Sequence, residues 1–111
     1  AFMKWLLQNH ANAACVHQVH IDETNPKEFA QFPDQVLQAT FDPSDRKFAA
    51  VAATHPDKPP ILQAADCKWV AWWQPLQAHG IEVRFPCPTD IKAFYGNKFP
   101  NVAVPPLPGG I

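Results

Sequence analysis

The chain has 111 residues, and its nine basic and ten acidic side chains give a net charge of −1. This length suits one small domain, and a hydrophobic content of 47% supports a packed core and excludes wholesale disorder. The balanced charge excludes a nucleic-acid binder that relies on bulk positive charge, although it allows a local basic rim around an acidic site.

From the N-terminus, the spacing of apolar residues predicts a helix over about 2–11. Alternating residues then predict a short strand over 15–21. The stretch 22–40 contains two prolines and is expected to be a loop with one or two helical turns.

The clearest predicted element is a helix over 41–54, with Asp42 or Ser44 as its N-cap and Pro43 near its start. A short buried strand is expected to follow at 61–64.

The next predicted helix spans 66–79, is interrupted at Pro75 and ends at Gly80. A strand follows at 81–85. The order helix, strand, helix, strand predicts parallel pairing with right-handed crossovers.

Beyond this strand we expect a turn of helix through Ile91, Phe94 and Tyr95. We place one domain at 1–95 and a Pro-rich tail on its surface at 96–111.

Three cysteines, an odd number without a Cys-x-x-Cys pair, predict neither a disulfide framework nor a zinc ribbon and favour a reducing compartment. No apolar run reaches the roughly 18 residues of a membrane-spanning helix, and no charged-then-apolar leader is present. We therefore expect a cytoplasmic protein without a membrane partner.

Two aspartates are the main candidates for chemistry. Asp45 falls in the opening turn of the predicted helix over 41–54, and Asp66 falls just past the strand at 61–64. Ligands of open α/β sheets bind outside the strand ends, and two acids converging there predict a hard divalent cation such as Mg²⁺ or Mn²⁺. The alternatives are a carboxylate that favours the helix dipole for Asp45 and a helix cap for Asp66. Asp42 competes with Asp45 as a ligand, although capping is its expected role.

Basic and aromatic residues flank these acids. Arg46, Lys47 and Lys68 could contact phosphates, or they form a solvated charged face. Three tryptophans of the helix over 66–79 could stack on unpaired bases, although core packing is the more ordinary role. Because the adjacent Trp72 and Trp73 cannot both face the core, one is expected to be exposed or buried in a partner.

Two other kinds of site have weaker support. Cys15, His17 and His20 imitate part of a zinc site, but no fourth ligand is apparent and the two histidines would lie on opposite faces of a strand. The only serine, Ser44, is explained as a cap.

The stretch 41–88 resembles the carboxy-terminal half of a PIN domain, the fold of many metal-dependent ribonucleases. The matching features are Asp45 before a helix of small residues, the apolar strand before Asp66, and Trp69 soon after it. Gly80 then leads into a final strand, and the Cys-Pro pair at 87–88 is similar to the ending of some bacterial PIN-like proteins. The resemblance covers a little under half of the chain.

The resemblance implies a small three-layer α/β domain over 1–95 with a short parallel sheet, truncated at its N-terminus. The family's opening strand, its terminal Asp and an acid on an early helix have no counterpart here. Of four expected acids only Asp45 and Asp66 match, and they would be the catalytic residues and the ligands of Mg²⁺ or Mn²⁺.

By this resemblance the chain is expected to be an endoribonuclease-type domain that cleaves single-stranded RNA, held by Arg46, Lys47 and Lys68. If it is toxin-like, an antitoxin-like protein would be its partner. Two carboxylates alone are expected to hold Mg²⁺ weakly, which leaves open whether this chain by itself is active.

The alternative is a non-catalytic interaction or oligomerisation module derived from a PIN fold. A missing first strand would expose a sheet edge, and the apolar side of the first helix would also be uncovered. A second copy of the chain or another protein could cover either surface, and the Pro-rich tail could dock on a neighbour.

Overall fold

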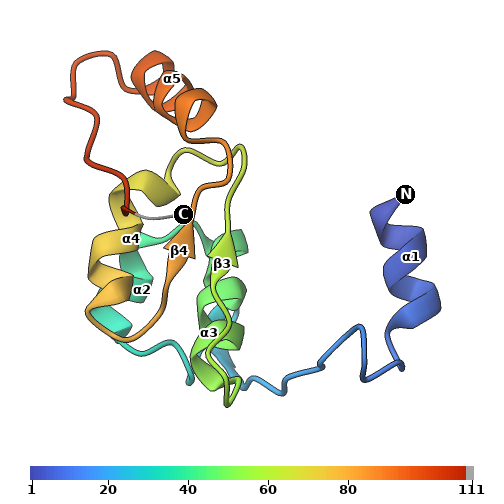
Figure 1. Cartoon of the computed structure of the whole chain (residues 1–111). Coiled ribbons are helices and arrows are strands. Elements are labelled where there is room, and N and C mark those ends of the chain that lie inside the picture. The colour runs from blue at the N-terminus through green and yellow to red at the C-terminus, as the bar shows by residue number, and fades with distance from the viewer. Residues whose placement is uncertain (110–111) are drawn as a thin grey trace.

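The computed structural model describes residues 1–109 and has a small mixed α/β architecture (Figure 1). The elements in chain order are α1 (Phe2–Asn9), β1 (Glu23–Asn25), β2 (Glu28–Phe29), α2 (Gln35–Thr40), the 3₁₀ turn η1 (Pro43–Asp45), α3 (Arg46–Thr54), β3 (Ile61–Leu62), α4 (Trp69–Gln77), β4 (Val83–Arg84) and α5 (Pro88–Lys98).

The predicted parallel pairing is confirmed between β3 and β4. Ile61 lies opposite Val83 and Leu62 opposite Arg84, and the backbone N–H of Ile61 donates to the Glu82 carbonyl at 2.8 Å. Each strand has only two residues, shorter than predicted. The expectation of a buried strand is wrong for β3, because Leu62 is 64% exposed.

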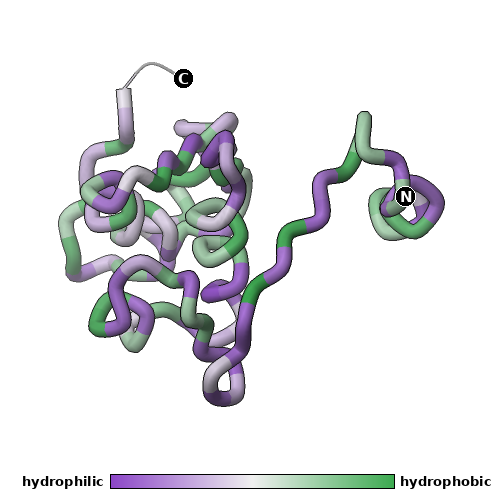
Figure 2. Tube along the Cα trace, turned by 90° about the horizontal axis from the view of Figure 1, so that it is seen from below, coloured by the Kyte–Doolittle hydropathy of each residue, from purple (hydrophilic) through white to green (hydrophobic). Residues whose placement is uncertain are grey.

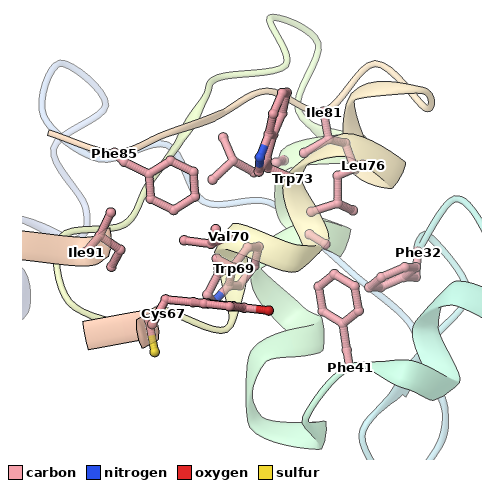
Figure 3. Close-up of a cluster of buried hydrophobic side chains, with 14 residues drawn as sticks. Phe32, Phe41, Cys67, Trp69, Val70, Trp73, Leu76, Ile81, Phe85 and Ile91 are labelled. Carbon is pink, nitrogen blue, oxygen red and sulfur yellow. The ribbon is translucent and has the colours of Figure 1, made fainter. Parts of the chain in front are cut away.

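Helix α4 supplies the centre of the hydrophobic core. It buries Trp69, Val70, Trp73 and Leu76, and Figure 3 shows these side chains between Phe85 and Ile91 on one side and Phe32 and Phe41 on the other. The predicted interruption at Pro75 is wrong, since the helix continues to Gln77. Burial of large side chains on both sides of the proline offsets the backbone hydrogen bond that it cannot donate.

Phe41 joins α4 to the segment before α3. Its ring stacks on Trp72 at a centroid distance of 4.1 Å and meets Trp69 and Phe32 edge-on at 5.5 and 5.1 Å. Both adjacent tryptophans therefore pack within the chain: Trp73 is buried, and Trp72 is half-buried against Phe41.

Two features of the first forty residues differ from the sequence expectation. Residues 15–21 have no regular secondary structure, because within residues 1–109 no neighbouring strand supplies the hydrogen bonds that an alternating pattern needs. In 22–40 the expected helical turns are confirmed as α2, but this stretch also contains the antiparallel hairpin of β1 and β2, which was not predicted. Asp34 caps α2 by accepting hydrogen bonds from the N–H groups of Val36 and Leu37, both at 3.0 Å.

The start of the helix predicted over 41–54 is also different. The α-helical part begins at Arg46, and η1 precedes it. Asp42 makes no capping hydrogen bond with its side chain, so the expected cap is wrong; its carboxylate contacts a lysine instead.

Helix α1 stands away from the rest of the chain on an extended arm (Figures 1 and 2). It buries no residue, and Phe2, Met3 and Leu7 are each more than 60% exposed. The radius of gyration of 15.0 Å exceeds the roughly 13 Å typical of a compact chain of this length, as a detached helix requires.

The carboxy-terminal part returns to α4. Helix α5 runs through residue 98 and so crosses the boundary drawn at 95. After it, the Pro106 carbonyl accepts a hydrogen bond from the Trp73 indole at 2.9 Å, and Leu107 packs against the core. Among the described residues, no helix has the length and apolar character required to cross a membrane.

Replacing Phe41 by alanine should lower the free energy of unfolding by roughly 3–5 kcal/mol, because a buried aromatic with three aromatic neighbours is lost. Urea denaturation followed by circular dichroism measures this change. Val36→Ala is the matched control, since Val36 is 81% exposed and should change stability by at most about 0.5 kcal/mol. Equal effects of the two substitutions would contradict the packing described for Phe41.

Candidate metal and nucleic-acid site

Asp45 and Asp66 come together in the structure. Asp45 ends η1 at the start of α3, and Asp66 lies in the connection between β3 and α4. The Asp45 side chain is 14% exposed, and its buried Oδ2 has no hydrogen-bond partner in the described chain. Burial, and secondly the negative charge of Asp66, raise the pKa of Asp45 above its ordinary value. Two carboxylates that interact through their charges, one with an unsatisfied oxygen, are an arrangement that a cation would stabilise.

Lys68 contacts all three aspartates of this region. Its ammonium bonds the carboxylate of Asp42 and lies 3.8 Å from Oδ2 of Asp45. Its backbone N–H donates to Oδ1 of Asp66 at 3.2 Å. Asp66 therefore also makes the kind of contact expected if its role were to cap the start of a helix. The Lys68 ammonium, which was predicted to contact RNA phosphates, instead contacts the carboxylates of Asp42 and Asp45.

The pKa of Asp45 is raised despite this nearby ammonium. Lys68 is closest to Asp42, and a separation of 3.8 Å from Asp45 is longer than a charge-assisted hydrogen bond. Burial, and secondly the Asp66 charge, are the causes of the raised pKa of Asp45. The site thus holds one half-buried carboxylate, with a buried Oδ2, whose charge is only partly compensated.

The other two predicted basic residues differ in their surroundings. The Arg46 guanidinium donates to the carbonyls of Phe41 and Lys27, both at 3.3 Å, which braces the hairpin against the start of α3. Lys47 is exposed, and its ammonium lies 5.6 Å from the centre of the Phe48 ring. Of the three predicted contacts to phosphate, Lys47 is the one whose cationic group lies at the surface without such bracing.

An aromatic hollow adjoins the acids. It has a volume of about 250 Å³ and lies between α4 and the end of α5. Lys68 lines it together with Ala71, Trp72, Tyr95 and Phe99. Because Trp69 and Trp73 are buried, Trp72 is the tryptophan of α4 that borders an open space beside the candidate site.

The donor set suits a weakly held hard cation. Mg²⁺ and Mn²⁺ prefer oxygen ligands, and Mg²⁺ keeps several waters when it binds to one or two carboxylates. Within residues 1–109 no group of three or more His, Cys, Asp or Glu side chains is placed to hold a metal ion. Asp45 and Asp66 therefore fit a site in which water supplies most of the ligands.

His17 and His20, on the extended segment after α1, contact different neighbours. The His17 ring faces His55, with Nδ1 and Nε2 3.0 Å apart, whereas His20 pairs with Asp22 at 2.7 Å. Sequence reasoning did not anticipate the contact with His55, because it joins positions 38 residues apart.

Asp42 is the residue at the site whose place was misjudged from the sequence. Its position before Pro43 indicated a cap, while its partner lies 26 residues further along the chain. In the sequence, Asp42 is next to Phe41 and Lys68 is next to Trp69. In the structure these two rings are in contact, which brings the two charged residues together.

Comparison of the chain with protein-family models, with curated proteins and with solved structures found no match.

Replacing Asp45 by asparagine should raise the melting temperature at pH 7. The fold raises the pKa of Asp45, so the stability that this residue contributes is present below the ordinary carboxyl pKa of about 4 and is lost as the pH rises through the raised value. Neutral asparagine avoids that loss, and its advantage should shrink as the pH falls towards about 4. Scanning calorimetry from pH 3 to 8 measures both trends.

The exposed Asp57 provides the control for this experiment, because Asp57→Asn should leave the melting temperature nearly unchanged. A lower melting temperature of Asp45→Asn at pH 7 would contradict the prediction and would mean that attraction to Lys68 outweighs burial.

Proposed function

We propose that the chain forms a PIN-like, three-layer domain that cleaves single-stranded RNA with Mg²⁺ or Mn²⁺. One observation carries the proposal: Asp45 presents a buried oxygen without a hydrogen-bond partner, and the negative charge of Asp66 acts on the same carboxyl group. A structural carboxylate would normally have a hydrogen-bond donor at that oxygen. A bound cation would supply the missing partner.

Asp45 and Asp66 would hold the ion. When bound, the ion would lower the pKa of a coordinated water and stabilise negative charge on the scissile phosphate. Lys47, exposed beside Asp45 in the sequence, would contact the RNA backbone and so position it without reading its bases.

The aromatic hollow supports a single-stranded substrate. A base can stack on Trp72 only if it is unpaired and splayed out, and the hollow shares Lys68 with the acidic site. A base seated there would place its phosphate near the carboxylates. If the activity is that of a toxin, a small antitoxin-like protein is the partner that would control it.

Wild-type protein should cleave a labelled single-stranded RNA in Mn²⁺, and a chelator should stop the reaction. Asp66→Asn should lower the rate by roughly 10²-fold or more, because electrostatic stabilisation of the transition state depends on the ion that Asp66 holds. Gel analysis of the RNA fragments measures the rate, and Asp57→Asn is the matched control. Cleavage that survives chelation or the Asp66 substitution would come from a contaminant or another site, and it would contradict this proposal.

A second function is favoured by a different observation. The apolar side chains of α1 are exposed, and a separate groove of about 620 Å³ lies between α3 and β3. Phe48, Val51 and Leu62 are among the apolar residues that line it. Unpaired apolar surfaces of this kind mark interaction sites, so the alternative function is a non-catalytic interaction or oligomerisation module.

The interaction function predicts an assembly in solution. Sedimentation equilibrium should give a mass at least twice the monomer mass of 12.4 kDa, and Trp5→Glu with Leu7→Glu should return it to the monomer value, because charge on α1 opposes burial. Val36→Glu, at an exposed position on α2, should leave the mass unchanged. A monomeric wild type at micromolar concentration would remove the self-assembly form of this function.

A further inference from the structure

Lys68 occupies the space in which a metal ion would be expected. Its ammonium touches Asp42 and approaches the unsatisfied oxygen of Asp45. The Lys68 side chain is 26% exposed, whereas those of Asp42 and Asp45 are 47% and 14% exposed. The ammonium is thus a cation already present at the acidic site, on a stem that reaches partly into solvent.

A divalent cation and this ammonium cannot share the site at low cost. A metal bound to Oδ2 of Asp45 would lie about 2 Å from that oxygen, and Lys68 Nζ lies 3.8 Å from the same atom. Like charges a few Å apart near a protein surface repel each other strongly. The ammonium can avoid this repulsion by turning towards water, because the four-carbon stem of lysine is flexible.

We propose that Lys68, bonded to Asp42, is a built-in counter-ion that competes with the divalent cation for the carboxylate of Asp45. Metal occupancy is then set by displacement of this ammonium. The inference rests on the proposed metal site and adds the residue that regulates its occupancy. It also gives Lys68 two positions, on the carboxylates without metal and towards an RNA phosphate with metal.

Binding of Mn²⁺ tests the competition directly. Electron paramagnetic resonance of free Mn²⁺ gives the affinity of wild type, Lys68→Met, Lys68→Arg and Lys47→Met. Methionine keeps an unbranched apolar stem without the charge, so Lys68→Met should bind Mn²⁺ at least about tenfold more tightly. Lys68→Arg keeps the charge and should not gain affinity. Lys47→Met removes an equal charge from the nearby surface and should stay within about twofold of wild type.

A second measurement uses wild-type protein and does not depend on a variant that folds. An amine-reactive label, quantified by mass spectrometry, should modify Lys68 several-fold faster in Mn²⁺ than in its absence, since displacement exposes the ammonium. Lys47 should show no such change.

Equal Mn²⁺ affinities of wild type and Lys68→Met, or no binding by either, would overturn the counter-ion role. Unchanged labelling of Lys68 in saturating Mn²⁺ would also overturn it. The RNA assay separates this result from the proposed function. Tighter Mn²⁺ binding by Lys68→Met without any cleavage would support the counter-ion and refute the nuclease. Metal-dependent cleavage without tighter Mn²⁺ binding by Lys68→Met would support the nuclease and refute the counter-ion role of Lys68.

Discussion

The contact between Phe41 and the two tryptophans Trp69 and Trp72 is the interaction on which the candidate site depends. Phe41 stacks on Trp72 and meets Trp69 edge-on. Phe41 is next in sequence to Asp42 and Trp69 is next to Lys68, so the aromatic packing brings Asp42 to Lys68 across 26 positions of the chain. Burial of apolar surface, which is not directional, thereby fixes a directional arrangement of charges at the edge of the core.

The electrostatics of that edge are uneven. Asp42 is half-exposed and paired with an ammonium, whereas Asp45 is deeper and has an unsatisfied oxygen. A carboxylate in such a place lowers the stability of the fold at neutral pH. Residues that cost stability are characteristic of functional sites, where selection for activity tolerates them. This imbalance distinguishes Asp45 from the capping Asp34, whose carboxylate accepts two backbone N–H groups.

Much of the order of elements could be predicted from the sequence. Apolar spacing located α3 and α4, and strand signals on either side of α4 predicted the parallel pair of β3 and β4. The neighbouring positions of Asp45 and Asp66 followed from that order. The place of each helix and strand depends on its own segment or on one connection along the chain, so local sequence patterns can predict it.

Features that depend on distant partners could not be predicted in this way. The alternating residues 15–21 do not form a strand, because pairing requires a neighbour that the pattern cannot supply. Helix α4 passes Pro75 owing to the burial of its neighbours. The contacts of Lys68 with Asp42 and Asp45 arise only after the core has set the distance between their segments. The charges of the site were visible in the sequence, but their pairing was not.

The bond from the Trp73 indole to the Pro106 carbonyl closes a loop of 33 residues around β4 and α5. The end of this loop is fastened to the same helix from which it departs. Helix α5 is therefore part of this closed loop, and detaching α5 from the core must either break the bond or carry residues 99–106 along with the helix. This closure couples the segment from β4 to Pro106 to α4 as one cooperative unit. The proline-rich segment after α5 therefore stabilises the attachment of α5 to the core.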